Sequence, residues 1–219
     1  AQRRDSTCAM CFWGEAWARG AYLNGPMDSA GAPAAFAAAH RAHALLTSRS
    51  RAVDRALIEA MLVRYAPTFV RRDRPGLDSA YAAAMARVYD DHSRDLDVGT
   101  LYAEALMLLE PRRGTWAIEK PAVRRIHAVL ESVLKRDRAH PGACHLYVHA
   151  TESTSQPGKA EACAELLGSS IPGASHINHM PSHTFNRIGR WGEAVRANIQ
   201  AWHSDLRSES GGGFALTPA

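Results

Sequence analysis

An internal repeat in the last third of the chain places the strongest constraint on what this sequence can fold into. When the sequence is shifted by 34 residues, several residues fall on identical ones, among them His145 on His179, His149 on His183, Gly158 on Gly192 and Ala160 on Ala194. Chains that repeat at such an interval place one supersecondary unit in each repeat, and a single unit cannot bury its apolar face alone. The repeat therefore predicts a stack of similar units that share one continuous core.

Each unit is predicted to be a helical hairpin. Amphipathic stretches alternate with short breaks that contain glycine or proline, and the 40 alanines of the chain favour helix over strand. Proline is suited to the first turn of a helix and glycine to the position after its end. We therefore expect almost no sheet and ten helices, which span 9–22, 31–47, 50–65, 77–91, 97–110, 120–137, 142–154, 158–169, 176–189 and 191–206.

Thirty-four residues is also the period of the tetratricopeptide repeat (TPR). The segment RIGRWGEAVRANIQAW (187–202) resembles the second half of such a repeat, and DSTCAMCFWGEAWARG (5–20) resembles its first helix. This resemblance implies an all-α, TPR-like α-solenoid of about five helix hairpins over residues 1–207. Its best-matched repeats are 141–174 and 175–208. The Gly-rich tail, 208–219, cannot bury an apolar face and is predicted to be flexible.

A narrower resemblance rests on two histidine-rich segments, HPGACHLYVHATES (140–153) and HINHMPSHTFNRIGRW (176–191). Together they look like a bacterial family of TPR proteins whose members pair two such helices. The resemblance implies a fold and a candidate site, but it carries no known reaction to this chain.

Histidine clustering identifies that candidate site, because six of the eleven histidines fall between 140 and 183. Residues at i, i+4 and i+7 share one face of a helix, which places His145, His149 and Glu152 in one stripe. The second stripe contains His176, His179 and His183. Pro181 falls within this stripe, so the helix is expected either to kink there or to begin near Met180 and leave His176 and His179 in its lead-in turn. Stacked repeats bring matched stripes side by side, so imidazoles from both helices can converge on one ion.

Three uses of this cluster stay open at the level of sequence. The first is a transition-metal site for copper, zinc or iron, in which His145, His149, His179 and His183 share an ion and His176 and His140 lie nearby. Glu152 could then be a further ligand, an acceptor that orients an imidazole, or a general base. The second use is a polar packing network, and the third is binding of a peptide or small molecule without metal.

Other candidate residues are assigned by the TPR resemblance or by spacing. In TPR arrays this helix face lines a concave groove, which implies that Asn186 and Arg187 project into it. Trp13 and Trp17, one turn apart, could form an aromatic wall of the groove, although packing is the commoner use of such a pair. His40 and His43 are predicted to lie on the surface.

The four cysteines do not predict a disulfide framework in a chain of this length. Cys8 and Cys11 could bind metal or form a disulfide, but at this helical spacing the favoured interpretation is a buried small residue beside one without a role. Cys144 and Cys163 are predicted to be core residues.

Charge and hydropathy exclude two classes of partner. The net charge is only +4 and the arginine pairs are scattered, whereas a nucleic-acid binder concentrates basic residues on one face. No run approaches the roughly 18 apolar residues of a membrane span. The Ala1-Gln2 start resembles the residue left by signal cleavage and favours export to the periplasm or the extracellular space. A chain trimmed here, or preceded by a further segment, would begin in the same way.

The sequence thus predicts a metal-binding TPR-like protein that could be a metalloenzyme acting on a small molecule or peptide in the groove. One alternative is a peptide- or protein-binding TPR scaffold without metal. Another is a structural solenoid that associates head to tail, because its terminal hairpins lack polar caps.

Overall fold

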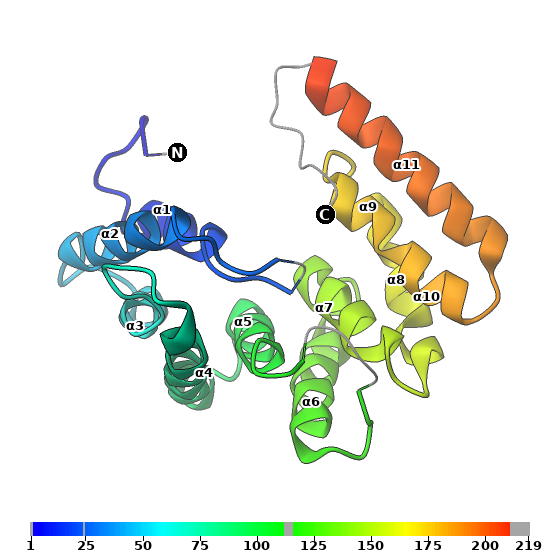
Figure 1. The fold of residues 1–219 in the computed structure, drawn as a ribbon, viewed down its shortest axis with the longest axis horizontal. Coiled ribbons are helices and arrows are strands. Elements are labelled where there is room, and N and C mark those ends of the chain that lie inside the picture. The colour runs from blue at the N-terminus through cyan, green and yellow to red at the C-terminus, as the bar shows by residue number, and fades with distance from the viewer. Residues whose placement is uncertain (1, 24, 112–115, 211–219) are drawn as a thin grey trace. The chain divides into compact units, whose positions relative to one another are not determined.

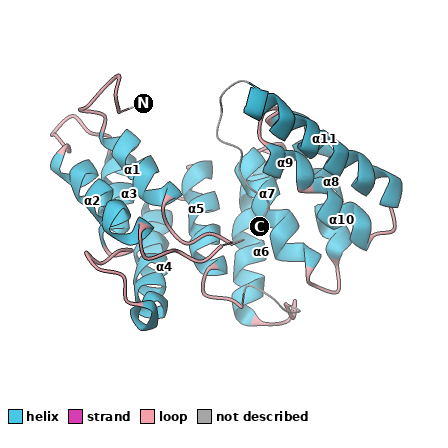
Figure 2. Ribbon diagram, turned by 45° about the horizontal axis from the view of Figure 1, so that its top comes forward, coloured by secondary structure: helices cyan, strands magenta, loops and turns pink. Residues whose placement is uncertain are grey.

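The computed structural model describes residues 2–23, 25–111 and 116–210, and these are almost entirely helical (Figures 1 and 2). Their only β pairing is an isolated bridge between Tyr22 and Gly25. The all-α prediction is therefore confirmed. The chain divides into two compact units, Ala1–Arg112 and Arg113–Ala219, and each is described by itself.

Unit 1 is a stack of helices in which each helix packs against the next. Its elements are α1 (Ala9–Ala18), α2 (Gly31–Ala44), α3 (Ala52–Leu62), the 3-10 turn η1 (Arg71–Asp73), α4 (Arg74–Asp91) and α5 (Leu96–Met107). The core is filled by alanine, methionine and aliphatic side chains, among them Ala35, Ile58, Met61, Met85 and Val98. Small alanines on α2 allow close approach of α1, which packs against both α2 and α3.

A buried arginine, Arg64, lies in the core of unit 1 and was not predicted from the sequence. The Arg64 side chain is fully buried, and its Nη2 donates to the Ala21 carbonyl at 2.7 Å. Its guanidinium carbon lies 4.5 Å from the centre of the Tyr81 ring. Glu104 is also buried and accepts a 2.8 Å hydrogen bond from the Trp17 indole, which ties α1 to α5.

Unit 2 carries the histidine-rich segments in the stacked arrangement that the repeat predicts. It comprises α6 (Pro121–Arg136), α7 (Pro141–Glu152), η2 (Pro157–Ala160), α8 (Glu161–Ser170), α9 (Ser175–His179), α10 (Pro181–Arg187) and α11 (Trp191–Ser210). Helix α7 packs against α6, α8 and α10, and α10 packs in turn against α8 and α11 (Figure 1). Helices α7 and α9 begin 34 residues apart, so unit 2 is a TPR-like stack of hairpins that keeps the TPR interval.

The predicted helix 176–189 is divided in two at Pro181, where the sequence predicts an interruption. Pro181 has no N–H to offer the carbonyl four residues earlier, so α9 ends at His179 and α10 begins at Pro181. The hairpin then closes at Gly189, which is the only glycine in the described part of the chain with a positive φ, 81°. Arg190 N donates to the Phe185 carbonyl at 2.8 Å across this turn, a Schellman-type helix end that only glycine accommodates without strain.

The boundary of the tail and the cysteine assignments need correction. Helix α11 continues to Ser210, beyond the predicted start of the tail at 208, and residues 211–219 lie outside the described part of the chain. All four cysteines are paired: Cys8 with Cys11, which the sequence allowed but did not favour, and Cys144 with Cys163, which was not predicted. The second pair is buried as expected of core residues, and it links α7 to α8 directly beside His145.

Candidate metal centre

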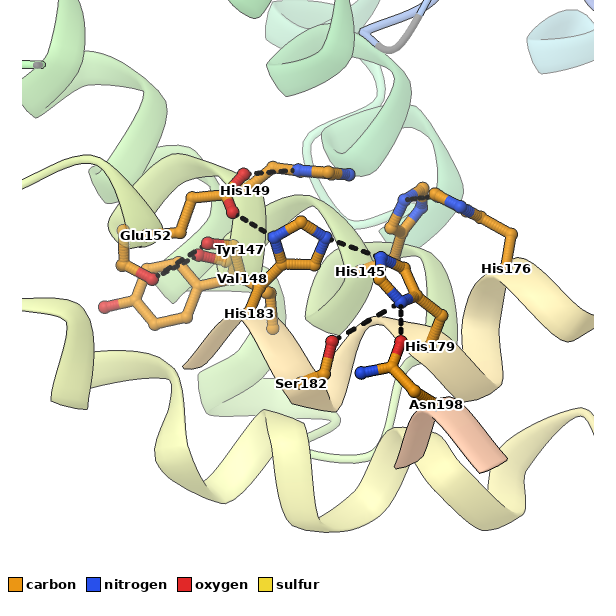
Figure 3. A network of polar contacts seen from close by, with 11 residues as sticks. His145, Tyr147, Val148, His149, Glu152, His176, His179, Ser182, His183 and Asn198 are labelled. Atoms are coloured by element: carbon orange, nitrogen blue, oxygen red, sulfur yellow. Dashed lines mark hydrogen bonds and ion pairs between the residues drawn. The ribbon is translucent and has the colours of Figure 1, made fainter. Parts of the chain in front are cut away.

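The two histidine stripes face each other in unit 2, as their matched spacing predicts (Figure 3). His145 and His149 extend from α7, His176 and His179 from α9, and His183 from α10. The Nε2 atoms of His145 and His176 lie 3.1 Å apart, and those of His179 and His183 lie 2.9 Å apart. The ring of His149 lies between the pairs, with its centre 5.0 Å from that of His145 and 5.6 Å from that of His183.

Three of these histidines form a group that could hold one metal ion. His145, His149 and His176 each offer a ring nitrogen, and these nitrogens all lie within 4.8 Å of one another. His176 therefore takes a place in the group that the sequence analysis gave to His179 and His183. His176 and His179 both lie on α9, so their different places follow from their positions along this short helix, whereas His183 lies beyond the break at Pro181 on α10.

Glu152 orients the histidines around it. One carboxylate oxygen accepts a 2.8 Å hydrogen bond from Nδ1 of His149, and the other oxygen pairs with Nδ1 of His183. Burial raises the pKa of Glu152, but the hydrogen bonds from His149 and His183 outweigh this and lower the pKa to about 2. Glu152 is thus ionised at neutral pH and acts as an acceptor for both rings. This arrangement favours the orienting role among the three that the sequence left open.

The buried Nε2 of His149 is the most informative atom of the site. Its side chain is only 7% exposed, and Nε2 has no hydrogen-bond partner. In the neutral ring the proton lies on Nδ1 and is donated to Glu152, so Nε2 holds an unshared lone pair. A buried acceptor without a partner costs about 1–3 kcal/mol, which a bond to a metal ion would offset.

Burial also keeps the neighbouring imidazoles neutral. Burial lowers the pKa of His145 well below its ordinary value of 6.5, and charge repulsion from His149 and His176 lowers it further. The same two kinds of effect lower the pKa of His176 to about 4. Burial lowers the pKa of His179 as well, against the opposing effect of the hydrogen bond that its Nδ1 makes to Oδ1 of Asn198. Neutral imidazoles are the form that binds metal.

The remaining predicted site residues lie outside this group. His140 is the N-cap of α7, where its Nδ1 accepts from Ala143 N at 3.2 Å. Asn186 and Arg187 are exposed at the end of α10, and Arg187 donates to the Thr154 carbonyl. Both tryptophans belong to unit 1, where Trp13 donates to the Leu57 carbonyl and stacks on Trp17.

Asn198 is a site residue that the sequence analysis missed. Its Oδ1 lies 2.6 Å from Nδ1 of His179, and its Nδ2 donates to the Ala194 carbonyl at 2.9 Å. Asn198 lies on α11, 19 residues from His179, and belongs to no motif. Only the packing of α11 against α9 brings the two together.

Comparison with known proteins adds little to this description. Neither a protein-family model nor a curated protein matches the sequence. A solved structure called "MamA MSR-1 C2" aligns with 95% of this chain over 99% of its own, at 11% identity and a TM-score of 0.49. No described helix is both long enough and apolar enough to span a bilayer.

Proposed function

We propose that this chain binds a transition-metal ion through His145, His149 and His176. The observation that carries the proposal is the buried, partnerless Nε2 of His149 beside two further imidazoles. Zinc, copper and iron all accept neutral imidazole, and three protein nitrogens leave a coordination position for water or a small substrate. Such an open site suits a metalloenzyme, with Glu152 holding the rings in the metal-binding tautomer.

Metal content tests this function directly. Protein purified without a histidine tag is stripped with a chelator, reloaded with Zn²⁺ or Cu²⁺, and analysed by plasma mass spectrometry. We expect His149→Ala to lower the affinity at least tenfold, because it removes a coordinate bond. His40→Ala, an exposed histidine of unit 1, is the matched control and should bind as the parent does.

A parent protein that binds neither zinc, copper nor iron would refute the metal proposal. The cluster would then be a polar network or a binding surface, and the TPR-like scaffold that binds peptides without metal would be the better interpretation.

A second function, self-association, is favoured by an unpartnered apolar stripe on α11. The stripe consists of five exposed side chains: Trp191, Val195, Ile199, Trp202 and Leu206. Their spacing of three and four residues places them on one helix face, as in the seam of a coiled coil. The opposite face, with Ala194, Ala197 and Ala201, is buried within unit 2. We propose that a second copy of the chain covers the stripe.

Light scattering after size exclusion tests this contact across a range of protein concentrations. The parent should form dimers or larger assemblies, and Trp202→Glu should be monomeric because it places a charge in the apolar contact. Arg196→Glu, which changes charge on the same helix outside the stripe, should associate like the parent. A parent that is monomeric at every concentration would refute the proposal.

A further inference from the structure

We propose that the histidine cluster holds a second metal ion, bound by His179 and His183 beside the first. This inference rests on the proposed metal-binding function and extends it from a mononuclear to a dinuclear centre. Two observations support it: the hydrogen-bond partners of Nδ1 in these two rings, and the distances that separate them from the first group.

Hydrogen bonding uses the Nδ1 atom of both rings. The ionised carboxylate of Glu152 can only accept, so Nδ1 of His183 is the donor in that pair. Asn198 donates its Nδ2 to the Ala194 carbonyl, which turns Oδ1 toward Nδ1 of His179 at 2.6 Å. The Ser182 hydroxyl lies farther from the same Nδ1, at 3.4 Å. Nδ1 of His179 is therefore also a donor.

The Nε2 atoms of His179 and His183 face each other at 2.9 Å. A neutral imidazole carries a single N–H, and in the neutral form of both rings that proton lies on Nδ1. Two lone pairs then face each other, an arrangement that a shared cation, either a proton or a metal ion, relieves. His145 and His176 are not constrained in this way, because one of those rings can donate its Nε2 proton to the other.

The separation matches two ligands on one ion. With metal–nitrogen bonds of 2.0–2.1 Å, nitrogens that subtend a right angle at the metal are about 2.9 Å apart, and tetrahedral ones about 3.3 Å apart. The distance between His179 and His183 is thus an edge of a coordination polyhedron. These two histidines supply two ligands and leave further positions on the ion open.

One ion cannot serve all five histidines in this geometry. Ligands on opposite sides of an ion are at most about 4.2 Å apart, and His179 and His183 fall outside the group of nitrogens that lie within 4.8 Å of one another. The rings are nevertheless adjacent, since the centres of His176 and His179 are 6.2 Å apart. Glu152 bonds to one ring of each set, His149 and His183, and so couples the two positions.

A dinuclear centre would favour one class of ligand. In two-metal sites the ions lie about 3.5–4 Å apart and bind a small oxygen-donor ligand between them, such as hydroxide or the oxygen of a substrate anion. The open positions on both ions of this centre would accept such a bridging oxygen.

The test counts ions. Apo-protein is dialysed against Zn²⁺ and the bound metal per chain is measured. We expect two ions in the parent and in His40→Ala, and one ion in His179→Ala. Asn198→Leu, which removes the acceptor that sets the His179 tautomer, should weaken binding of the second ion and spare the first. Circular dichroism of each variant confirms that it is folded.

Each outcome decides a different question. One ion in the parent refutes the second site and leaves the proposed function standing, whereas no ion refutes both. Loss of all metal from folded His179→Ala would show a single shared site and also overturns the inference. With Cu²⁺, two adjacent ions should give a spin-coupled paramagnetic resonance signal in the parent and an isolated-ion signal in His179→Ala. An isolated-ion signal from the parent loaded with two ions would place them apart and refute a dinuclear centre.

Discussion

Replacing Glu152 by glutamine tests whether this carboxylate sets the protonation of the histidine cluster. In the parent, its two oxygens accept from Nδ1 of His149 and from Nδ1 of His183. Glutamine keeps the shape but offers one acceptor and one N–H donor. In one of the two rings the N–H at Nδ1 would then point at the N–H of the glutamine amide, so that ring must move its proton to Nε2. A ring with a proton on Nε2 cannot bind metal through that atom.

The expected magnitude follows from this loss of one oriented ligand. Outer hydrogen-bond partners of metal-binding histidines typically contribute 10–100-fold to metal affinity, or about 1.4–2.7 kcal/mol. Glu152→Gln changes the partner of two rings at once, so we expect the upper part of this range. Zinc affinity at neutral pH, measured by competition with a chromophoric chelator, gives the difference directly.

Glu131→Gln is the matched control for this substitution. Glu131 is also a carboxylate that bonds to α7, where it accepts from the Tyr147 hydroxyl at 2.6 Å, but it does not contact the histidines. Its replacement should leave zinc affinity unchanged. Equal affinity in folded Glu152→Gln and the parent would refute the orienting role. If such a variant kept its metal but lost turnover, Glu152 would instead be a general base.

Three further predictions concern the stability of the fold, measured by chemical denaturation. Burial raises the pKa of Glu104. Protonation of Glu104 therefore stabilises the folded state fully below pH 4.5, and this stabilisation is lost as the pH rises through the raised pKa. Glu104→Gln should remove this pH-dependent loss. Gly20→Ala should destabilise by about 2–4 kcal/mol, because its Cβ would clash with the buried hydroxyl of Tyr65, whereas Gly14→Ala has open space within α1 and should stabilise by about 0.5–1 kcal/mol. Cys163→Ser opens the disulfide between α7 and α8 and should cost about 2–4 kcal/mol under oxidising conditions, with no difference from the parent once both are reduced. The argument on Glu104 is wrong if Glu104→Gln leaves the pH profile of stability unchanged. The argument on the glycines is wrong if the two variants are equally stable, and the argument on the disulfide is wrong if Cys163→Ser is as stable as the oxidised parent.

The sequence alone was sufficient for the helical hairpins and for the segments of the chain that bring the histidines together. Helix formation and amphipathic packing depend on residues three and four apart, so the helix positions were predictable from local patterns. The 34-residue offset added the relation between neighbouring repeats, because stacked hairpins bring equivalent residues together. That is why His145 and His149 could be expected to face the stripe that contains His179 and His183.

Only the tertiary structure decided which histidines lie closest together. The sequence left open whether the second stripe kinks at Pro181 or begins a helix near Met180, and the structure divides it into α9 and α10 with His176 beside His145. Proton positions depend on partners distant in sequence, such as Asn198 on α11, which no spacing rule connects to His179. The pairing of Cys144 with Cys163 and the burial of Arg64 have the same origin. Such contacts arise from the packing of whole helices, whose distances and angles are set by side chains from many elements at once.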